Sequence, residues 1–346
     1  MKYLITGGAG FIGSNYLHYV VNKYKDDYFI CIDKLTYAGN YENIKSLEKM
    51  NNFKFIRGDI TKKKQVNDLF KKEKIDYCIN FAAESHVDNS IKNPCIFEKT
   101  NIKGTLVLLN ACNKYGIKKF HQISTDEVYG DLPLDLPDLK FSEESMLRPS
   151  SPYSASKASA DLLVMAYYRT YGLPVSISRC SNNYGPYQFY EKLIPLVISK
   201  ALNNEKIPIY GDGKNIRDWI HVMDHCVGID LIVRKGEVGE IYNIGGNSEI
   251  SNIELVKLIL KIMNKPFSLI EYVSDRPGHD LRYSVDFSKI QNKLGWSLKY
   301  NLKNGIIDTI DWYLNNKDWF KKDKWTEIFL VNGSIKTILS FFFTYN

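Results

Sequence analysis

Two groups of side chains in the middle of this 346-residue chain have the types and spacing for acid–base chemistry. Tyr153 and Lys157 stand four residues apart, which places a phenol and an ammonium on one face of a helix. Thr125, Asp126 and Glu127 are consecutive and follow an apolar run. A lysine can lower the pKa of a neighbouring tyrosine, which then serves as a base, and adjacent carboxyl groups can supply an acid and a base for an elimination. Spacing alone also fits a surface pair and a solvated acidic loop, so the surrounding elements decide between the interpretations.

A glycine-rich segment near the start of the chain is typical of nucleotide binding. The sequence GGAGFIG at residues 7–13 satisfies G-x-G-x-x-G at Gly8, Gly10 and Gly13. Glycines permit positive φ angles and let a pyrophosphate approach the N–H groups at the start of the following helix. Asp33 lies twenty residues beyond Gly13, where a carboxylate can bind the adenosine ribose hydroxyls and repel a 2′-phosphate. The segment therefore predicts an NAD site.

The elements that must position these residues alternate between strands and helices. The apolar runs that predict strands lie at residues 3–6, 29–32, 53–56, 77–81, 120–124 and 175–178. Helix-length segments separate them, which indicates βαβ units and a doubly wound, Rossmann-type parallel sheet of the α/β class. Ligands of such sheets bind at the carboxyl ends of the strands, and both the glycine segment and Thr125 fall there.

The regular alternation of strand and helix patterns ends after about residue 182. Shorter strands are expected at 207–210, 239–244 and 269–273, with a helix at 253–263 that Ser251 caps. We expect an NAD-binding Rossmann domain at 1–183, to which 218–246 return. A smaller, mixed α/β C-terminal substrate lobe is expected from 184–217 and 247–325. Residues 326–346 contain the run ILSFFF and form an atypical apolar tail, which is too short to span a bilayer.

Composition and charge exclude several classes of protein. The net charge of +7 is scattered along the chain, without the basic stripe or zinc-finger spacing of a nucleic-acid binder, so no nucleic-acid partner is expected. The six cysteines are dispersed without C-x-x-C spacing, which predicts reduced thiols. A strand begins at residue 2 and no apolar run reaches about 18 residues, so we expect a cytoplasmic protein with no signal peptide and no membrane partner.

Two further patterns favour no additional chemistry. His221 and His225 are one helical turn apart, but neither a cysteine partner nor a zincin motif accompanies them, so no metal is predicted. Ser124 and Ser154 lack the G-x-S-x-G elbow of serine hydrolases.

The motifs together resemble the extended short-chain dehydrogenase/reductase superfamily and, within it, the dTDP-glucose 4,6-dehydratases. The resemblance is carried by the glycine segment and by DKLTYAGN at 33–40, AESHVD at 83–88, TDEVYG at 125–130, SPYSASK at 151–157 and DRPGHD at 275–280. It runs from residue 1 to about 325.

The resemblance implies an NAD-dependent hydro-lyase that converts dTDP-glucose into dTDP-4-keto-6-deoxyglucose and water, as in rhamnose biosynthesis. Thr125 would bind the 4-hydroxyl of the sugar, and Tyr153, assisted by Lys157, would remove its proton while a hydride passes from carbon 4 to NAD. Glu127 would then take the proton from carbon 5 and Asp126 would protonate the departing 6-hydroxyl. The hydride would return to carbon 6.

The same resemblance implies the residues of the binding sites. Those expected at NAD are Gly7, Gly10, Phe11, Ile12, Gly13, Asp33, Lys34, Thr36, Asp59, Ile60, Phe81, Ala82, Ala83, Ser85, Thr100, Tyr153, Lys157 and Asn183. Those expected at the nucleotide sugar are Ser85, Thr125, Asn182, Lys192, Leu193, Pro208, Tyr210, Arg217, Asn252, Arg276 and His279. Arginine and lysine suit a diphosphate electrostatically.

Three alternatives remain at this point. The first is a dehydratase of UDP-glucose or another sugar nucleotide, since the pocket for the base is not readable from one sequence. The second is a nucleoside-diphospho-sugar 4-epimerase, which shares Tyr153 and Lys157 but has no need for Asp126 and Glu127. The third is a non-catalytic NAD-binding sensor, against which the intact Thr125 and tyrosine–lysine pair argue. A homodimer is expected through helices near 102–112 and 155–168.

Overall fold

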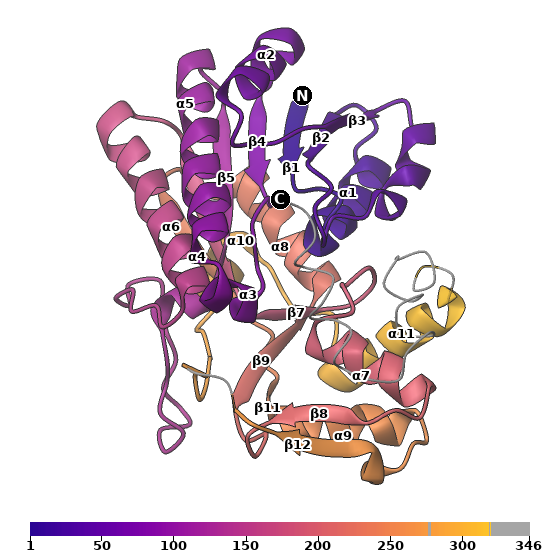
Figure 1. Ribbon diagram of the computed structural model, residues 1–346. Helices are drawn as coiled ribbons and strands as arrows, with labels where there is room; N and C mark the ends of the chain where they lie inside the picture. The colour runs from indigo at the N-terminus through magenta and orange to yellow at the C-terminus, as the bar shows by residue number, and fades with distance from the viewer. Residues whose placement is uncertain (276–277, 318, 320–346) are drawn as a thin grey trace.

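The central feature of the computed structural model, which describes residues 1–275, 278–317 and 319, is a seven-stranded sheet (Figure 1). Its strand order is β10-β6-β5-β4-β1-β2-β3, and every neighbouring pair is parallel. The strands are β1 (Lys2–Thr6), β2 (Tyr28–Asp33), β3 (Phe53–Arg57), β4 (Tyr77–Asn80), β5 (Lys119–Thr125), β6 (Val175–Cys180) and β10 (Glu240–Ile244). This order is that of a Rossmann fold and confirms the predicted fold class.

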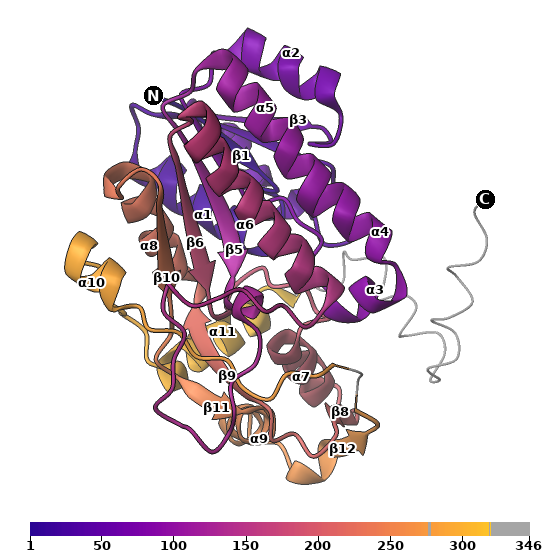
Figure 2. The same cartoon turned by 90° about the vertical axis from the view of Figure 1, so that its left-hand side faces the viewer.

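Helices cover both faces of the sheet, as the two views show (Figure 2). Ile5 packs in a hydrophobic cluster with Leu17 and Ile229, whereas the next residue back, Leu4, packs with Leu108 and Val164 in another. Side chains of a strand alternate between faces, so strands covered on both sides have nearly continuous apolar sequences. The helices of the Ile5 face are α1 (Phe11–Lys23), α8 (Val222–Lys235) and α10 (Ser288–Leu294), and those of the Leu4 face are α2 (Lys63–Glu73), α5 (Thr105–Tyr115) and α6 (Pro152–Tyr171).

Short helical segments complete the connections of this part. They are η1 (Tyr41–Asn43), η2 (Lys45–Lys49), α3 (Val87–Lys92), α4 (Pro94–Phe97), the π-helical segment η3 (Glu98–Gly104) and the 3₁₀ turn η4 (Asp126–Tyr129). Two of them lie at the carboxyl edge of the sheet, because α3 follows β4 and η4 follows β5 directly.

Two smaller sheets and their helices form a separate hydrophobic cluster below the main sheet in both views (Figures 1 and 2). One sheet has the order β11-β9-β7 and the other pairs β12 with β8. The elements are β7 (Asn182–Tyr184), α7 (Leu193–Leu202), β8 (Ile207–Tyr210), β9 (Ile216–His221), β11 (Glu249–Ser251), α9 (Asn252–Ile262), η5 (Phe267–Leu269), β12 (Ile270–Val273) and α11 (Leu302–Asn315). The predicted cap of α9 is present, because the Ser251 hydroxyl accepts a hydrogen bond from the Glu254 N–H at 3.3 Å.

The division into domains remains a prediction. Within the stretch predicted to return to the first domain, α8 packs against α1 and β10 forms the edge of the main sheet. The strand β9, in contrast, pairs within the smaller sheet. The apolar tail at 326–346 lies outside the described residues.

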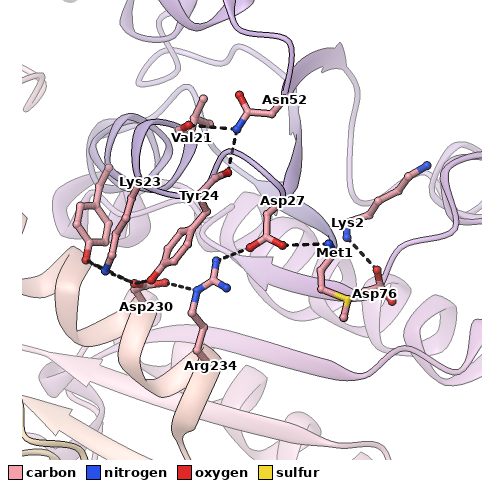
Figure 3. A network of polar contacts seen from close by, with 11 residues as sticks. Met1, Lys2, Val21, Lys23, Tyr24, Asp27, Asn52, Asp76, Asp230 and Arg234 are labelled. Atoms are coloured by element: carbon pink, nitrogen blue, oxygen red, sulfur yellow. Dashed lines mark hydrogen bonds and ion pairs between the residues drawn. The ribbon is translucent and has the colours of Figure 1, made fainter.

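A polar network ties α8 to the start of the chain (Figure 3). Arg234 donates to Asp230 and to Asp27, each at 2.8 Å, and Asp27 also binds the terminal ammonium of Met1 at 2.9 Å. The guanidinium lies 3.5 Å from the ring centroid of Tyr24. The network joins three segments that are distant in sequence at the edge of the sheet away from the carboxyl ends of its strands.

The remaining expectations about composition can be compared directly with the structure. All six cysteines are free thiols, and five of them are buried. No helix among the described residues has the length and apolar character needed to cross a membrane.

Candidate active site

A cavity of about 310 Å³ lies at the carboxyl edge of the main sheet. Its wall brings together the glycine segment after β1, the end of β2, the loop after β4, the end of β5 and the start of α6. Every residue expected at NAD lines this cavity, namely Gly7, Gly10, Phe11, Ile12, Gly13, Asp33, Lys34, Thr36, Asp59, Ile60, Phe81, Ala82, Ala83, Ser85, Thr100, Tyr153, Lys157 and Asn183. Thr125, Asp126 and Glu127 line it as well, so the two groups of acid–base residues share one space.

The glycine segment has the close packing that a phosphate cradle requires. A Cβ atom on Gly13 would lie 2.5 Å from the carbonyl oxygen of Gly7, and one on Gly7, whose φ is +67°, would lie 2.6 Å from the Ala82 nitrogen. Helix α1 begins at Phe11 with Gly10 as its N-cap and without a side-chain cap. The N–H groups of its first turn are therefore left for a ligand, and the helix dipole favours an anion there.

Asp33 holds the glycine segment against the end of β2. Its Oδ2 accepts a hydrogen bond from the Ala9 N–H at 2.9 Å, and its Oδ1 accepts one from the Leu35 N–H at 2.8 Å. A carboxylate oxygen can accept two hydrogen bonds, so capacity for ribose hydroxyls remains. Lys34 forms an ion pair with Asp59 at 3.1 Å, which gives the ammonium a partner other than a 2′-phosphate. These features fit NAD.

The start of α6 is fixed by a capping box. The Ser154 N–H donates to the Ser151 hydroxyl at 3.1 Å, and the Ser151 N–H donates to the Ser154 hydroxyl at 3.0 Å, with Pro152 in the first turn. This box places Tyr153 in the first turn of the helix and Lys157 one turn further along. Both side chains are buried and line the cavity.

The expected lowering of the Tyr153 pKa by Lys157 stays a prediction, because the other surroundings of the phenol act in the opposite direction. Burial raises the pKa of Tyr153 well above its usual value, the charge of Glu127 raises it further, and a side-chain hydrogen bond with Thr125 only lowers it in part. The Lys157 ammonium donates to the Ile123 carbonyl at 2.6 Å, and burial lowers its own pKa.

The surroundings of Asp126 favour the protonated form of its carboxyl group. Its side chain is 1% exposed, and burial, followed by the charges of Glu127 and Asp218, raises its pKa well above the usual range. Arg217 and a side-chain hydrogen bond with Thr125 oppose this shift. Among the described residues the Oδ2 atom of Asp126 has no hydrogen-bond partner. A protonated acid with one oxygen available for a substrate suits a proton donor.

Two acidic residues of the cavity wall, Glu84 and Glu191, lie outside the predicted set of site residues. Burial raises the pKa of Glu191 to about 7, with Glu84 and Asp88 raising it and Lys192 lowering it. The His86 Nε2 atom lies 3.8 Å from its carboxylate. The only signal for Glu191 in the sequence was an acid directly before a lysine in a loop without periodicity. Other residues of the wall outside the predicted set are Ile32, Ala38, Gly39, Gly58, Ile123, Ser124, Cys180, Ser181, Gln188 and Phe189.

The residues expected at the nucleotide sugar fall into two sets. Ser85, Thr125, Asn182 and Lys192 line the cavity, and the Lys192 ammonium donates to the Ser85 carbonyl at 2.9 Å. Leu193, Pro208, Tyr210, Arg217, Asn252 and His279 lie outside its lining, and Arg276 lies outside the described residues. The cavity therefore accounts for one end of the expected substrate site, and the roles of the second set remain predictions.

Arg217 and His279 belong to the set of expected substrate residues that do not line the cavity, and both have contacts with other residues. The Arg217 guanidinium donates to the Asp280 carbonyl at 2.9 Å and stacks on the Tyr283 ring at 4.4 Å. His279 pairs with Asp275 at 2.7 Å. Both side chains are held by the segment that follows β12.

The two histidines weighed as metal ligands have other surroundings. His225 shares a hydrogen bond of 2.8 Å with Asn183, and His221 stacks on the Tyr300 ring at 3.8 Å. Burial lowers the pKa of His221 to about 4 and that of His225 to about 3. No cluster of histidine, cysteine and acidic residues suited to a metal occurs within 1–275, 278–317 and 319.

Comparisons with known proteins agree with this geometry. Residues 4–309 match the family model described as GDP-mannose 4,6 dehydratase. A dTDP-glucose 4,6-dehydratase of Escherichia coli is 48% identical over 93% of this chain and 96% of its own length. The dTDP-glucose 4,6-dehydratase of Bacillus anthracis, solved with NAD, is 48% identical and superposes with a TM-score of 0.87 over 94% of this chain and all of its own. DesIV of Streptomyces venezuelae, a dTDP-glucose 4,6-dehydratase solved with NAD and dTDP, is 43% identical with a TM-score of 0.90 over the same shares.

Proposed function

This chain belongs to the GDP-mannose 4,6-dehydratase family of extended short-chain dehydrogenases/reductases, and on that premise we propose that it catalyses the NAD-dependent 4,6-dehydration of dTDP-glucose. The product is dTDP-4-keto-6-deoxyglucose, and water is released. The observation that carries the proposal is the meeting of Tyr153 and Lys157 with Asp126 and Glu127 at one cavity. A 4-epimerase needs the first pair only, and a non-catalytic sensor needs neither.

The glycine segment, Asp33 and the wall residues named above hold NAD. When bound, NAD accepts a hydride from sugar carbon 4 and later returns it to carbon 6. Lys157, held by the Ile123 carbonyl, positions the ribose of the nicotinamide half. These residues fit NAD for two reasons. The first turn of α1 has no side-chain cap, and the glycine at position 7 leaves space beside Ala82 that a Cβ atom would fill.

The oxidation of carbon 4 depends on Tyr153 and Thr125. Thr125 hydrogen-bonds the 4-hydroxyl, and Tyr153 takes the proton of that hydroxyl. Tyr153 acts in this step as the tyrosinate, so the phenol must first lose its own proton. Burial and the charge of Glu127 oppose this ionisation, and the positive charges of Lys157 and of an oxidised nicotinamide bound beside it would favour it.

The elimination depends on the two carboxyl groups of η4. The new ketone at carbon 4 acidifies the hydrogen at carbon 5, which Glu127 removes as base. Asp126, which keeps its proton because it is buried, donates that proton to the departing 6-hydroxyl. An acid and a base on one turn can act on neighbouring carbons of the same sugar.

The substrate diphosphate and base are assigned to the side of the smaller sheets. The nucleotide and diphosphate are assigned to Ser85, Asn182, Lys192, Leu193, Arg217, Asn252, Arg276 and His279, and the base is assigned to Pro208 and Tyr210. Support comes from the position of Lys192 at the cavity wall and from the burial of Arg217, whose hydrogen-bond partners in the described part of the chain are all backbone carbonyls. We assign residues 1–183 with 218–246 to the NAD-binding domain and 184–217 with 247–325 to the substrate lobe.

The chain is also proposed to act as a cytoplasmic homodimer without a nucleic-acid partner, in the synthesis of a deoxysugar such as rhamnose. Helices α5 and α6 lie side by side on one face (Figure 2). Leu162 of α6 is 62% exposed there, and Leu106 and Val107 of α5 are only partly buried. Packing against the same helices of a second copy would cover these apolar side chains.

Incubation of the purified protein with dTDP-glucose and, separately, with UDP-glucose tests the proposal. Proton NMR follows loss of the 6-hydroxymethyl signal and growth of a methyl doublet. We expect the methyl product from dTDP-glucose and far less from UDP-glucose, which is the nearest alternative substrate. A galactose epimer without a methyl signal would instead show a 4-epimerase, and no change in either sugar would favour a sensor.

A further inference from the structure

We propose that Tyr129 and Arg179 are positioning residues that hold the turn η4 in register with helix α6. The turn carries the proposed acid and base of the elimination, and the helix carries the tyrosine of the oxidation. Because both halves of the reaction must act on one bound sugar, the distance between these two elements has to be fixed. Since η4 is assigned its chemistry by the proposed function, the effect of these residues on turnover depends on that function.

The turn η4 cannot hold its own position. It is a single 3₁₀ turn of four residues, and one isolated turn is unstable without tertiary contacts. Its first end is capped by the Thr125 hydroxyl, which accepts a hydrogen bond from the Glu127 N–H at 3.3 Å. Its last residue is Tyr129, which is 1% exposed, and Gly130 beyond it has a φ of +92°. The side chain of Tyr129 is therefore one anchor of the second end, beside the buried Val128, whose carbonyl accepts a hydrogen bond from the Arg148 N–H at 3.0 Å.

The phenol of Tyr129 has one possible hydrogen-bonding arrangement. The Asn243 Nδ2 donates to the carbonyls of Phe141 and Asp286, each at 3.2 Å, so its Oδ1 faces the phenol. The Tyr129 hydroxyl donates to this Oδ1 at 2.8 Å and accepts from Arg179 Nη1 at 3.0 Å. Burial raises the pKa of Tyr129 to about 12, so the proton that this arrangement requires is retained at neutral pH.

Arg179 connects Tyr129 of η4 to Asp161 of helix α6. Its Nε donates to Asp161 Oδ2 at 2.9 Å, and its guanidinium lies 4.9 Å from the centroid of the Tyr129 ring. Asp161 also accepts a hydrogen bond from the Ser124 hydroxyl at 3.0 Å, directly before the Thr125 cap. Asp161 stands one helical turn beyond Lys157 on α6.

The ion pair between Arg179 and Asp161 is buried, and burial of two charges costs free energy. Arg179 is 3% exposed and Asp161 is 1% exposed, and burying two charges is expensive unless their geometry and hydrogen bonds are good. These contacts link β5, β6, β10, η4 and α6 beside Ser124, which lines the cavity. Among the described residues Asp161 Oδ1 has no hydrogen-bond partner, so Oδ2, which accepts from both Ser124 and Arg179, carries the connection and restricts the position of η4 relative to α6.

Replacement of Tyr129 by phenylalanine tests this role, because the ring is kept and only the two hydrogen bonds are lost. Tyr242→Phe is the matched control, since Tyr242 is also fully buried, lies on β10 and has a single hydrogen bond from the Glu237 N–H at 3.0 Å. Arg179→Lys is a second variant that keeps the charge opposite Asp161 and loses the planar donor group. Amide hydrogen exchange of residues 125–130 and turnover of dTDP-glucose are measured for each, with the absorbance of reduced nicotinamide followed during turnover.

We expect exchange in residues 126–129 of Tyr129→Phe to rise about tenfold, while the rest of the sheet is unchanged. The kcat should fall about ten- to a hundredfold with KM within about twofold, because a catalytic group displaced by about 1 Å can cost about 10²-fold. Reduced nicotinamide should accumulate during turnover, since oxidation continues while elimination slows. Tyr242→Phe should show none of these changes.

Several results would overturn the role of Tyr129. Exchange at 126–129 equal to that of the wild type would show that the turn does not depend on the phenol. A lower kcat without accumulation of reduced nicotinamide, or the same behaviour in Tyr242→Phe, would indicate a merely structural residue. If Tyr129→Phe fails to fold, the same comparison with Arg179→Lys decides. If the wild type forms no methyl product, the proposed function fails, whereas the exchange data still decide whether Tyr129 holds the turn.

Discussion

Burial separates the two carboxyl groups of η4 at the scale of single residues. Asp126 is enclosed, and its carboxyl group is favoured in the protonated form, whereas Glu127 is only partly buried. Adjacent acids in different surroundings are a recurrent way to obtain a proton donor and a proton acceptor in one site. The roles proposed for the two residues therefore differ because their side chains, although carried by the same short turn, are buried to different extents.

Asp126→Asn removes the transferable proton and keeps the shape of the side chain. We expect kcat to fall about 10²- to 10⁴-fold, the usual contribution of a general acid, while the oxidation of carbon 4 continues. A single-turnover experiment that follows reduced nicotinamide and the methyl product checks this. Glu144→Gln, at an exposed position, is the control for loss of one negative charge. A rate within about threefold of the wild type would contradict the role of Asp126.

Glu191 provides a pH-dependent prediction for stability. Its pKa is raised from 4.5 to about 7, so the folded protein holds a proton that the unfolded chain has released. The stabilisation is fully present below about pH 4.5 and is lost as the pH rises through about 7. At about 1.4 kcal/mol per pKa unit, the ionised carboxylate costs at most about 3 kcal/mol.

Glu191→Gln removes this titration. The variant should have a higher thermal midpoint than the wild type at pH 8, and the difference should disappear toward pH 4.5. The two proteins are compared by differential scanning calorimetry across this range at equal NAD content. A difference that grows toward acid pH would show the opposite sign and contradict the raised pKa.

At the scale of elements, the site depends on where strands and helices end. The carboxyl ends of β1, β2 and β5 and the first turns of α1 and α6 meet at the cavity. Each end is fixed by a local device, such as the capping box of Ser151 and Ser154 or the close approach of Gly7 and Gly13. Because these ends are fixed, the side chains that they carry into the site have fixed positions as well.

Gly13→Ala tests the glycine segment. Its Cβ would lie 2.5 Å from the Gly7 carbonyl oxygen and 2.8 Å from the Gly8 Cα, so the segment must shift away from α1. We expect the purified variant to lose bound NAD, which is measured by its absorbance after denaturation. Gly295→Ala is the control, because its Cβ meets nothing within 4 Å and only its positive φ costs about 1 kcal/mol. Normal retention of NAD in Gly13→Ala would contradict the proposed cradle.

The same scale explains what the sequence could and could not predict. The strands of the main sheet begin and end within about two residues of the prediction, because strands covered on both faces form long apolar runs. The three-residue strands β7 and β11 went unpredicted, since so few residues show no periodicity. Around the site, the glycine segment and the Tyr153 motif were visible as local patterns. Glu191, in contrast, reaches the cavity through the packing of a loop, which no local pattern encodes.

At the scale of the whole molecule, the main sheet carries the residues proposed for the chemistry, and the part with the smaller sheets carries most of those proposed to bind the diphosphate and base of the substrate. Helices α5 and α6 cover one face of the main sheet, whereas the smaller sheets lie below that sheet (Figure 2). A second copy docked there would leave the cavity edge available for both protomers. Burial by the whole assembly of elements raises the pKa of Tyr153, and the lowering expected from Lys157 stays a prediction.

Leu162→Arg tests the proposed homodimer. A charge at this 62% exposed position would have to be buried in the contact, so the protein should elute from a sizing column as a single chain instead of a pair. Val238→Arg, at a 45% exposed position that follows α8, is the control and should leave the elution unchanged. An unchanged pair with Leu162→Arg would exclude this face as the dimer contact.

The central claim is that one cavity carries out oxidation, elimination and reduction on the same sugar, and isotope transfer tests it most directly. The purified protein is incubated in D₂O with dTDP-glucose carrying deuterium at carbon 4, and again in H₂O, and the product is examined by NMR and mass spectrometry. We predict that the deuterium of carbon 4 is found in the methyl group at carbon 6 and that carbon 5 carries one solvent hydrogen. Loss of the carbon 4 label to the solvent, or its retention at carbon 4 of an unchanged or epimerised sugar, would contradict the account.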